Sequence, residues 1–194
     1  NFSLLVVFTT YSVLKLYYTS DNDSREDIYM RRKDRQMPEE FALGVIDKCS
    51  FAQVAMTDEK GNPYCVPLSV AGDGGSIYFH SAFEGTKTDI LKRNPKVYVS
   101  CVGDVTPATD RFTTEFESAA FSGTACEVTD IQEKIKALRL ICEKYTPDNM
   151  ENFEDAIAKS LDRTAVWKIR IEDLTGKRKK YDKSGEEMKF GRME

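Results

Sequence analysis

The chain has 194 residues, of which 41% are hydrophobic and 31% charged, a composition typical of a soluble globular domain. Its formal net charge of −4 argues against a nucleic-acid partner. The five cysteines form no Cys-x-x-Cys pair and the chain has one histidine, so no metal site is predicted. We interpret the cysteines as buried free thiols of a cytoplasmic protein: Cys49, Cys65, Cys101, Cys126 and Cys142.

The N-terminal stretch, residues 1–20, is apolar and rich in β-branched side chains. It is at the short limit for a membrane span, and it lacks the basic start and cleavage site of a signal peptide. A polar run then leads to Met30. We therefore predict that 1–29 is a non-native or disordered extension, that 30–175 is the folded domain, and that 176–194 is a charged, frayed tail. No membrane association is expected.

Pro38 is predicted to open a helix that ends near Cys49, because two glutamates in its first turn suit the helix dipole. Three strands follow, joined by glycine-containing turns that are typical of consecutive hairpins. They are Phe51–Thr57, Pro63–Val70 and Ser76–Ala82.

Pro67 interrupts the second of these strands. Proline cannot donate a hydrogen bond to a strand ladder, so we expect this strand to lie on an edge or to be irregular there. One interpretation is simple protection of a sheet edge. The other is that the unpaired backbone beside Pro67 faces the polar atoms of a ligand.

The second half of the chain alternates between helical and extended patterns. Gly123 suggests a bend in a long strand, and Asp130 is the predicted N-cap of the clearest helix. The mostly antiparallel order predicts a small β-barrel of about six strands with peripheral helices. The expected elements are a helix over Gly85–Arg93, a strand over Lys96–Val102, a loop over Gly103–Arg111, a strand over Thr113–Val128, helices over Ile131–Tyr145 and Phe153–Leu161, and a strand over Ala165–Ile171.

The stretch Ile77–Lys87 reads as a strand that runs into the first turn of a helix. Ser81, Gly85, Thr86 and Lys87 gather at that helix start, where free N–H groups and the helix dipole favour an anion such as a phosphate. These residues could equally be ordinary caps and a solvated lysine.

His80, the single histidine, lies at the end of the same strand. Alternation places it on one face with Tyr78 and Ala82, while Phe79 and Ser81 occupy the other face. A lone strand histidine can be a half-buried, hydrogen-bonded residue. Beside a phosphate site it can also transfer a proton near neutral pH or act as a nucleophile.

Several runs of the sequence, spread over Met30 to Asp182, resemble the nitroimidazole-resistance (Nim-type) proteins. These belong to the pyridoxamine 5′-phosphate oxidase-like, FMN-binding split-barrel superfamily. The run around His80 is the most specific of them. The matching runs are Met30–Arg35, Gly61–Leu68, Ile77–Ala82 with Gly85 and Lys87, Asn94–Pro95 before a valine-rich strand, Phe121–Ala125 and Trp167–Ile169.

The resemblance implies a mainly β (β+α) fold, a six-stranded split β-barrel that is mostly antiparallel and forms a homodimer with FMN at the interface. The flavin would lie along the Val66–Ser69 strand, with its phosphate near Ser81 and Lys87, and His80 would be catalytic. The implied cofactor-binding residues are Val66, Pro67, Leu68, Ser69, Phe79, His80, Ser81, Ala82, Gly85, Thr86 and Lys87.

Three functions follow from the resemblance. The first is an FMN-dependent oxidoreductase that passes electrons from a reduced donor to a small electrophile such as a nitroaromatic. The second is a non-catalytic flavin- or haem-binding carrier or sensor, in which His80 would be the axial ligand of a haem. The third is a vitamin B6 binder like pyridoxamine 5′-phosphate oxidase, although the arginine-rich signatures of the true oxidases are not evident.

Overall fold

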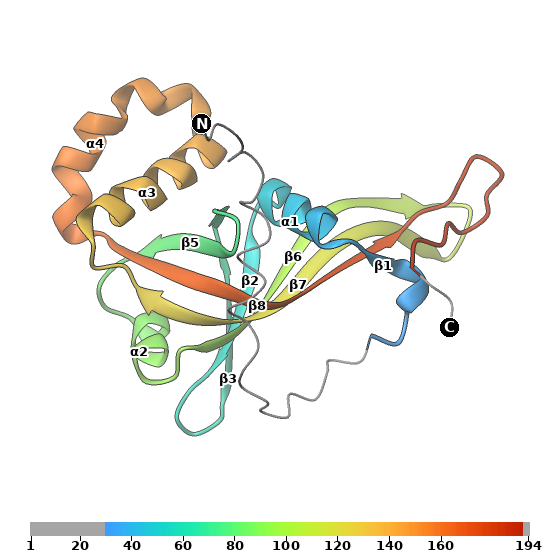
Figure 1. Cartoon of the computed structure of the whole chain (residues 1–194), viewed down its shortest axis with the longest axis horizontal. Coiled ribbons are helices and arrows are strands. Elements are labelled where there is room, and N and C mark those ends of the chain that lie inside the picture. The colour runs from blue at the N-terminus through green and yellow to red at the C-terminus, as the bar shows by residue number, and fades with distance from the viewer. Residues whose placement is uncertain (1–29, 192–194) are drawn as a thin grey trace, which may run out of the picture. The chain divides into compact units, whose positions relative to one another are not determined.

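The computed structural model describes residues 30–191, and these contain one antiparallel sheet of eight strands and four α-helices (Figure 1). The sheet order is β3–β2–β6–β7–β8–β5–β4, with β1 added beside β8. The strands are β1 (Gln36–Met37), β2 (Ala52–Thr57), β3 (Pro63–Leu68), β4 (Ala71–Gly72), β5 (Ser76–Ser81), β6 (Lys96–Ala108), β7 (Thr113–Glu127) and β8 (Ala165–Lys179). The helices are α1 (Glu39–Lys48), α2 (Thr86–Arg93), α3 (Ile131–Tyr145) and α4 (Phe153–Ser160).

The predicted class, a mainly antiparallel β+α fold, is confirmed. The sheet has eight strands rather than the predicted six. The two additional strands, β1 and β4, are only two residues long. Its terminal strands, β3 and β4, do not pair with each other, so the barrel stays split. Pro67 lies in β3, which pairs only with β2 in the described part of the chain, so the predicted edge position is also confirmed.

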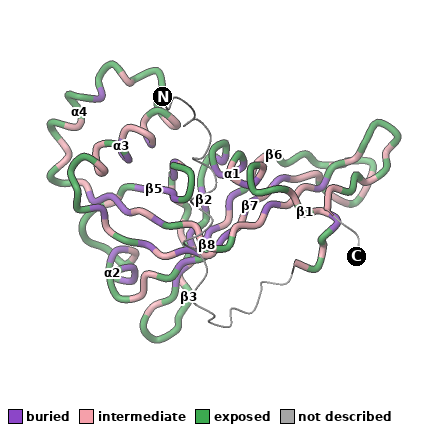
Figure 2. Tube along the Cα trace, in the orientation of Figure 1, coloured by how far each residue is buried: buried purple, intermediate pink, exposed green. Residues whose placement is uncertain are grey.

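Strand β5 separates two apolar cores. Ile77 and Phe79 face the larger core, which is formed inside the curled sheet and beneath α1. Tyr78 faces the smaller core, where α3 and α4 cover the other side of the strand. Figure 2 shows the resulting buried stretches along β5 and the first half of β8. The alternation expected for this strand is therefore the one observed.

The loop predicted over Gly103–Arg111 is wrong, because β6 continues to Ala108. After a register shift between Val102 and Val105, it pairs with β7 as far as Ala108 opposite Thr113. Pro107 is tolerated here because the pairing of β6 with β2 ends at Cys101, so one side of the strand has no ladder to break.

The frayed tail expected from residue 176 onward is wrong for the residues up to 191. Strand β8, predicted to stop at Ile171, runs on to Lys179 and pairs with β7 and β1. Gly176 is buried there, and a Cβ at that position would lie 3.1 Å from the Cβ of Ala42. The close approach of α1 to this part of β8 therefore favours a residue without a side chain, since a Cβ there would fit only if Ala42 shifted slightly.

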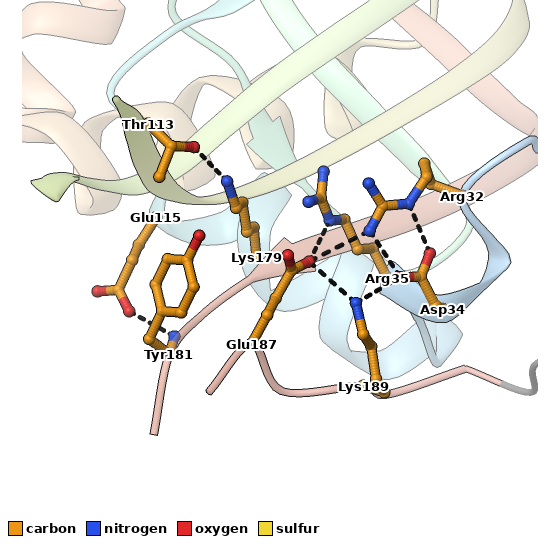
Figure 3. Close-up of polar contacts among 9 residues, drawn as sticks. All are labelled: Arg32, Asp34, Arg35, Thr113, Glu115, Lys179, Tyr181, Glu187 and Lys189. Carbon is orange, nitrogen blue, oxygen red and sulfur yellow. Dashed lines mark hydrogen bonds and ion pairs between the residues drawn. The ribbon is translucent and has the colours of Figure 1, made fainter. Parts of the chain in front are cut away.

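Beyond β8, the chain is held by ion pairs to residues near the start of the domain (Figure 3). Glu187 accepts hydrogen bonds from Arg35 at 2.7 Å and Arg32 at 3.2 Å, and Lys189 donates to Asp34 at 2.8 Å. These partners are more than 150 residues apart in sequence, so no local pattern of charge could have revealed them.

Acid should loosen this contact. The Arg35 guanidinium, followed by Lys189, lowers the pKa of Glu187 to about 2 from its ordinary 4.5. A carboxyl whose pKa is lowered by folding stabilises the fold above its ordinary pKa, and loses that contribution as the pH falls toward the lowered value. We therefore expect the advantage of the wild type over Glu187→Gln in melting temperature to shrink between about pH 5 and about pH 2.

Thermal melts followed by circular dichroism across that range would measure the effect. Glu186→Gln is the matched control, because the exposed neighbouring glutamate has no such contacts with Arg32 and Arg35. A wild-type advantage that stays constant with pH would contradict the assignment.

The five cysteines are free thiols, but only two are buried. Cys49 and Cys101 lie in the larger core, and Cys142 is half-buried. Cys65 and Cys126 are exposed, because they occupy outward positions on β3 and near the end of β7, so the prediction of burial is wrong for these two.

The prediction made for residues 1–29 lies outside the described residues. Between residues 30 and 191, none of the helices has both the length and the apolar character that a membrane crossing requires.

Candidate functional site

The turn between β5 and α2 is shaped by Gly85. Its φ of +131° is a conformation that side chains disfavour. The Gly85 carbonyl accepts a hydrogen bond from the Asp89 N–H at 3.0 Å and from the Thr88 hydroxyl at 2.7 Å, which closes the first turn. Burial of Thr88, Ile90 and Leu91 fixes the helix against the sheet. As in any helix, the first N–H groups of α2 have no partners within the helix. The positive end of the helix dipole lies at the same place.

A pocket of about 290 Å³ lies at this helix start. Strand β3 contributes to one side of it, although four strands separate β3 from β5 in the sheet order. The sheet therefore curls far enough to bring its β3 edge beside the start of α2. The lining residues are Tyr64, Val66, Ser81, Ala82, Glu84, Gly85, Thr86, Lys87 and Thr88.

Lys87 gives the pocket its main positive charge. Its side chain is half-buried, and burial lowers the pKa of its ammonium group. The Nζ atom lies 5.2 Å from the centroid of the Phe79 ring, but no carboxylate pairs with it among residues 30–191. Glu84 also lines the pocket, with an exposed side chain. A half-buried cation without an anionic partner, next to free helix N–H groups, fits a bound phosphate.

The aromatic layer behind Lys87 contains the single tryptophan of the chain. Trp167 stacks on Phe79 with ring centroids 6.5 Å apart and planes inclined by 7°. Its side chain is buried, and its indole N–H has no hydrogen-bond partner within residues 30–191. Trp167 and the Lys87 ammonium group therefore both lie against the Phe79 ring.

His80 lies beside this pocket without lining it. In β5 it follows Phe79 and sits opposite Val166, on the face that carries Tyr78. Although its ring reaches solvent, partial burial lowers the pKa of its imidazole, and the positive charge of Lys87 lowers it further. The neutral imidazole is therefore favoured at neutral pH.

The protonation of His80 can be followed directly, because the chain has no other histidine. We expect its imidazole resonances to titrate with a midpoint below the ordinary 6.5. Lys87→Met should raise that midpoint only part of the way, because burial is the larger cause and Lys87 the smaller one. Proton NMR titration of untagged protein measures both midpoints. A midpoint that does not respond to Lys87→Met would show that the two groups do not interact.

The predicted site residues fall into two groups. The pocket brings together Val66, Ser81, Ala82, Gly85, Thr86 and Lys87. Pro67, Leu68, Ser69, Phe79 and His80 do not line it. Sequence reasoning missed Tyr64, Glu84 and Thr88, although Tyr64 lies two residues from Val66 on the same face of β3 and Thr88 lies in the first turn of α2.

A second pocket, of about 320 Å³, lies on the other side of Thr86. It is lined by residues of the β2–β3 turn and of α2: Asp58, Glu59, Lys60, Thr86, Asp89, Ile90 and Arg93. Three carboxylates face two cations there, and Arg93 already pairs with Glu59 at 3.1 Å. This charge balance suits a phosphate less well than the pocket around Lys87.

Residues 39–178 match the family model described as pyridoxamine 5′-phosphate oxidase. The chain belongs to the pyridoxamine 5′-phosphate oxidase family. This match includes β3, β5 and α2, so the pocket around Lys87 lies within the family domain. No curated protein matches the sequence of the chain.

Solved structures resemble this pyridoxamine 5′-phosphate oxidase-family domain. A proposed 5-nitroimidazole antibiotic resistance protein from Bacteroides thetaiotaomicron is 27% identical, with a TM-score of 0.63 over 74% of this chain and 86% of that one. The flavocytochrome Anf3 from Azotobacter vinelandii is 19% identical, with a TM-score of 0.64 over 86% and 84%. An FAD- and heme-binding protein from Mycobacterium smegmatis is 17% identical, with a TM-score of 0.64 over 82% and 77%. At these lower identities the likeness shows the fold.

Proposed function

We propose that the chain binds FMN in the pocket around Lys87 and uses it to reduce a small electrophile such as a nitroaromatic compound. The carrying observation is the half-buried Lys87 ammonium, which lines the pocket at the start of α2 and pairs with no carboxylate of the described residues. The phosphate would bind Lys87 and the first N–H groups of α2, and the flavin ring would extend along β3. Bound flavin would supply the electron transfer, while the chain binds and orients it.

The proposed substrate class rests on the resemblance to the Bacteroides protein, which is 27% identical to this chain. The proposed cofactor is supported by the family match and by the flavoproteins that share the fold. The pocket favours FMN over FAD. Its lining contains one lysine, which suits the single terminal phosphate of FMN.

The visible spectrum of the purified protein tests the cofactor first. Two broad bands in the near-ultraviolet and blue would indicate a flavin, and extraction followed by mass spectrometry would identify it. Titration of flavin-free protein with FMN should quench the fluorescence of Trp167, because this residue stacks on Phe79 beneath Lys87. Stopped-flow reoxidation of the reduced protein by a nitroaromatic compound then tests the reaction. A protein that takes up no flavin would overturn the proposal.

We propose His80 as the proton donor near the reacting end of the flavin. Proton donation requires the imidazolium form of His80, which its lowered pKa makes a stronger acid, and alanine removes this donor, so His80→Ala should lower turnover of FMN-loaded protein by at least about tenfold. FMN affinity should change much less, since His80 does not line the pocket. Steady-state turnover and the FMN dissociation constant, measured on the same preparations, separate the two effects. Full turnover in the variant would exclude this role.

A flavin or haem carrier without turnover is the second candidate. The lowered pKa of His80 favours neutral imidazole, the form that binds haem iron. Two proteins of the same fold are a flavocytochrome and an FAD- and heme-binding protein. A sharp Soret band that disappears in His80→Ala would support this candidate over the reductase. Displacement of FMN by pyridoxal phosphate would instead support a vitamin B6 ligand.

We also propose that the protein is a homodimer. The outer face of β2 and β6 exposes large apolar side chains, among them Phe51, Tyr98 and Val102, which are 51%, 41% and 51% exposed. Phe51 precedes β2, and Val102 follows Cys101, the partner of Ala52, so the two lie next to each other in the sheet. A second copy would cover this apolar face. Analytical ultracentrifugation should give twice the chain mass, and Val102→Glu should shift the protein toward the monomer.

A cytoplasmic location is supported by the five free thiols, two of them exposed, which suit a reducing compartment. Fractionation of cells that express the natural gene would test it.

A further inference from the structure

The loop between β5 and α2, residues 82–85, forms part of the pocket around Lys87, yet none of its residues is buried. Ala82, Glu84 and Gly85 line the pocket, while Phe83 does not. The Phe83 side chain is 41% exposed, so burial alone does not fix its position. A loop without buried residues moves readily unless other contacts hold it.

A lysine of α3 contacts this loop. The Lys134 ammonium lies 5.5 Å from the centroid of the Phe83 ring, within the range of a cation–π interaction. The same ammonium donates a hydrogen bond at 2.7 Å to the carbonyl of Leu161, directly after α4. The Lys92 ammonium also approaches the Phe83 carbonyl, but at 3.4 Å this exposed contact is at the long limit of a hydrogen bond. Lys134 therefore joins the Phe83 ring to α3 and to the end of α4.

The position of Lys134 is itself well fixed. Asp130 caps α3, and its backbone carbonyl accepts the Lys134 N–H at 2.9 Å. The buried face of α3 packs in the smaller core, and Leu161 packs against the same core. Two elements of one core thus hold the lysine, whereas the loop that it contacts contributes no residue to either core.

We propose that Lys134 is a positioning residue, which holds the pocket loop through the Phe83 ring and thereby strengthens FMN binding. Its role toward FMN rests on the proposed binding of this cofactor in the pocket around Lys87. A loop that is already fixed in its bound conformation loses less freedom when the ligand binds, so the ligand binds more tightly. Neither Lys134 nor Phe83 lines the pocket, so their effect must pass through the loop.

Phe83→Leu isolates the ring contact, because it keeps an apolar side chain and leaves the hydrogen bond from Lys134 to Leu161 intact. We expect this variant to bind FMN about two- to fivefold more weakly, the loss that corresponds to one exposed cation–π interaction. Lys134→Met should lose at least as much. The double variant should be no weaker than the weaker single variant, because both substitutions remove the same contact. Two losses that multiply in the double variant would overturn the proposal.

Two further variants separate positioning from a general loss of structure. Lys134→Arg keeps a cation that can lie over the same ring, and it should restore the wild-type affinity for FMN. Lys136→Met removes an exposed lysine of the same helix, which pairs with Asp73 outside the pocket, and should leave the affinity unchanged. An equal loss of affinity in these two variants would overturn the proposal, because the helix and not the contact would then be responsible.

Nuclear magnetic relaxation of backbone 15N in the flavin-free protein tests the contact without any cofactor. The order parameters of residues 82–85 should fall from about 0.85, the value of rigid backbone, toward about 0.6 in Phe83→Leu and Lys134→Met but not in Lys136→Met. Unchanged order parameters in all three variants would overturn the proposal, whether or not the protein binds flavin. Lower values in a protein that takes up no flavin would support the contact and overturn the proposed cofactor instead.

Discussion

Replacing Lys87 with methionine is expected to weaken FMN binding roughly 10- to 100-fold. A hydrogen bond to a charged group contributes about 1.5–3 kcal/mol, and about 1.4 kcal/mol corresponds to a factor of ten in affinity. Lys87 is the only lysine or arginine that lines the pocket within the described part of the chain. Methionine keeps an apolar stem over the Phe79 ring, so the fold should survive the change. Fluorescence titration of Trp167 with FMN gives the dissociation constant.

Two controls make the Lys87 experiment specific to the phosphate. Lys92→Met changes an exposed lysine in the last turn of α2, outside the pocket, and should leave FMN affinity unchanged. Riboflavin, which lacks the phosphate, should bind the wild type and Lys87→Met with similar affinity. If the substitution weakens riboflavin as much as FMN, Lys87 acts on the ring or on the fold, and the assignment of the phosphate to this pocket is wrong.

The elements that were predictable from sequence are those fixed by neighbouring residues. Helix α3 spans the predicted Ile131–Tyr145, and the side chain of its predicted N-cap, Asp130, accepts the Glu133 N–H at 2.8 Å. The bend predicted at Gly123 corresponds to the register shift between Phe121 and Gly123 in β7. Capping, helical periodicity and glycine placement act within a few residues, so they can be read along the chain.

The predictions that failed depended on distant partners. The segment 103–108 has turn-like residues, including Pro107, and becomes a strand only because β7 returns beside it. The charged residues after Gly176 look suited to water, but Glu187 meets Arg32 and Arg35 across the domain. Tertiary pairing overrode local composition in both places.

The candidate site divides in the same way. The cluster from Ser81 to Lys87 is a local strand-to-helix junction, and all of its residues except Phe83 line one pocket. The wall contributed by β3 depends on how strongly the sheet curls, which no local pattern specifies. The pocket therefore includes Tyr64 and Val66 but not Leu68 or Ser69. Residues that a second subunit would add to a flavin site also cannot be predicted from one sequence.

Gly123→Ala is expected to destabilise the protein by about 1–3 kcal/mol, because the new methyl group has no room. A Cβ at this position would lie 2.6 Å from the backbone oxygen of Arg170 and 2.7 Å from Cγ2 of Ile169. Both atoms belong to β8, whose pairing with β5 and β7 prevents it from moving away. The strand would have to widen at its register shift. Chemical denaturation, analysed with a common slope for wild type and variant, measures the loss.

Gly44→Ala provides the matched comparison, because it adds the same methyl group to a glycine with open surroundings. Gly44 is exposed in the middle of α1, and a Cβ there would meet none of the described residues within 4 Å. Alanine restricts the unfolded chain more than glycine and favours the helix, so stability should rise by about 0.5–1 kcal/mol. The two substitutions thus have opposite expected signs. If both substitutions destabilise the protein to a similar extent, close packing against β8 is not the reason for glycine at position 123.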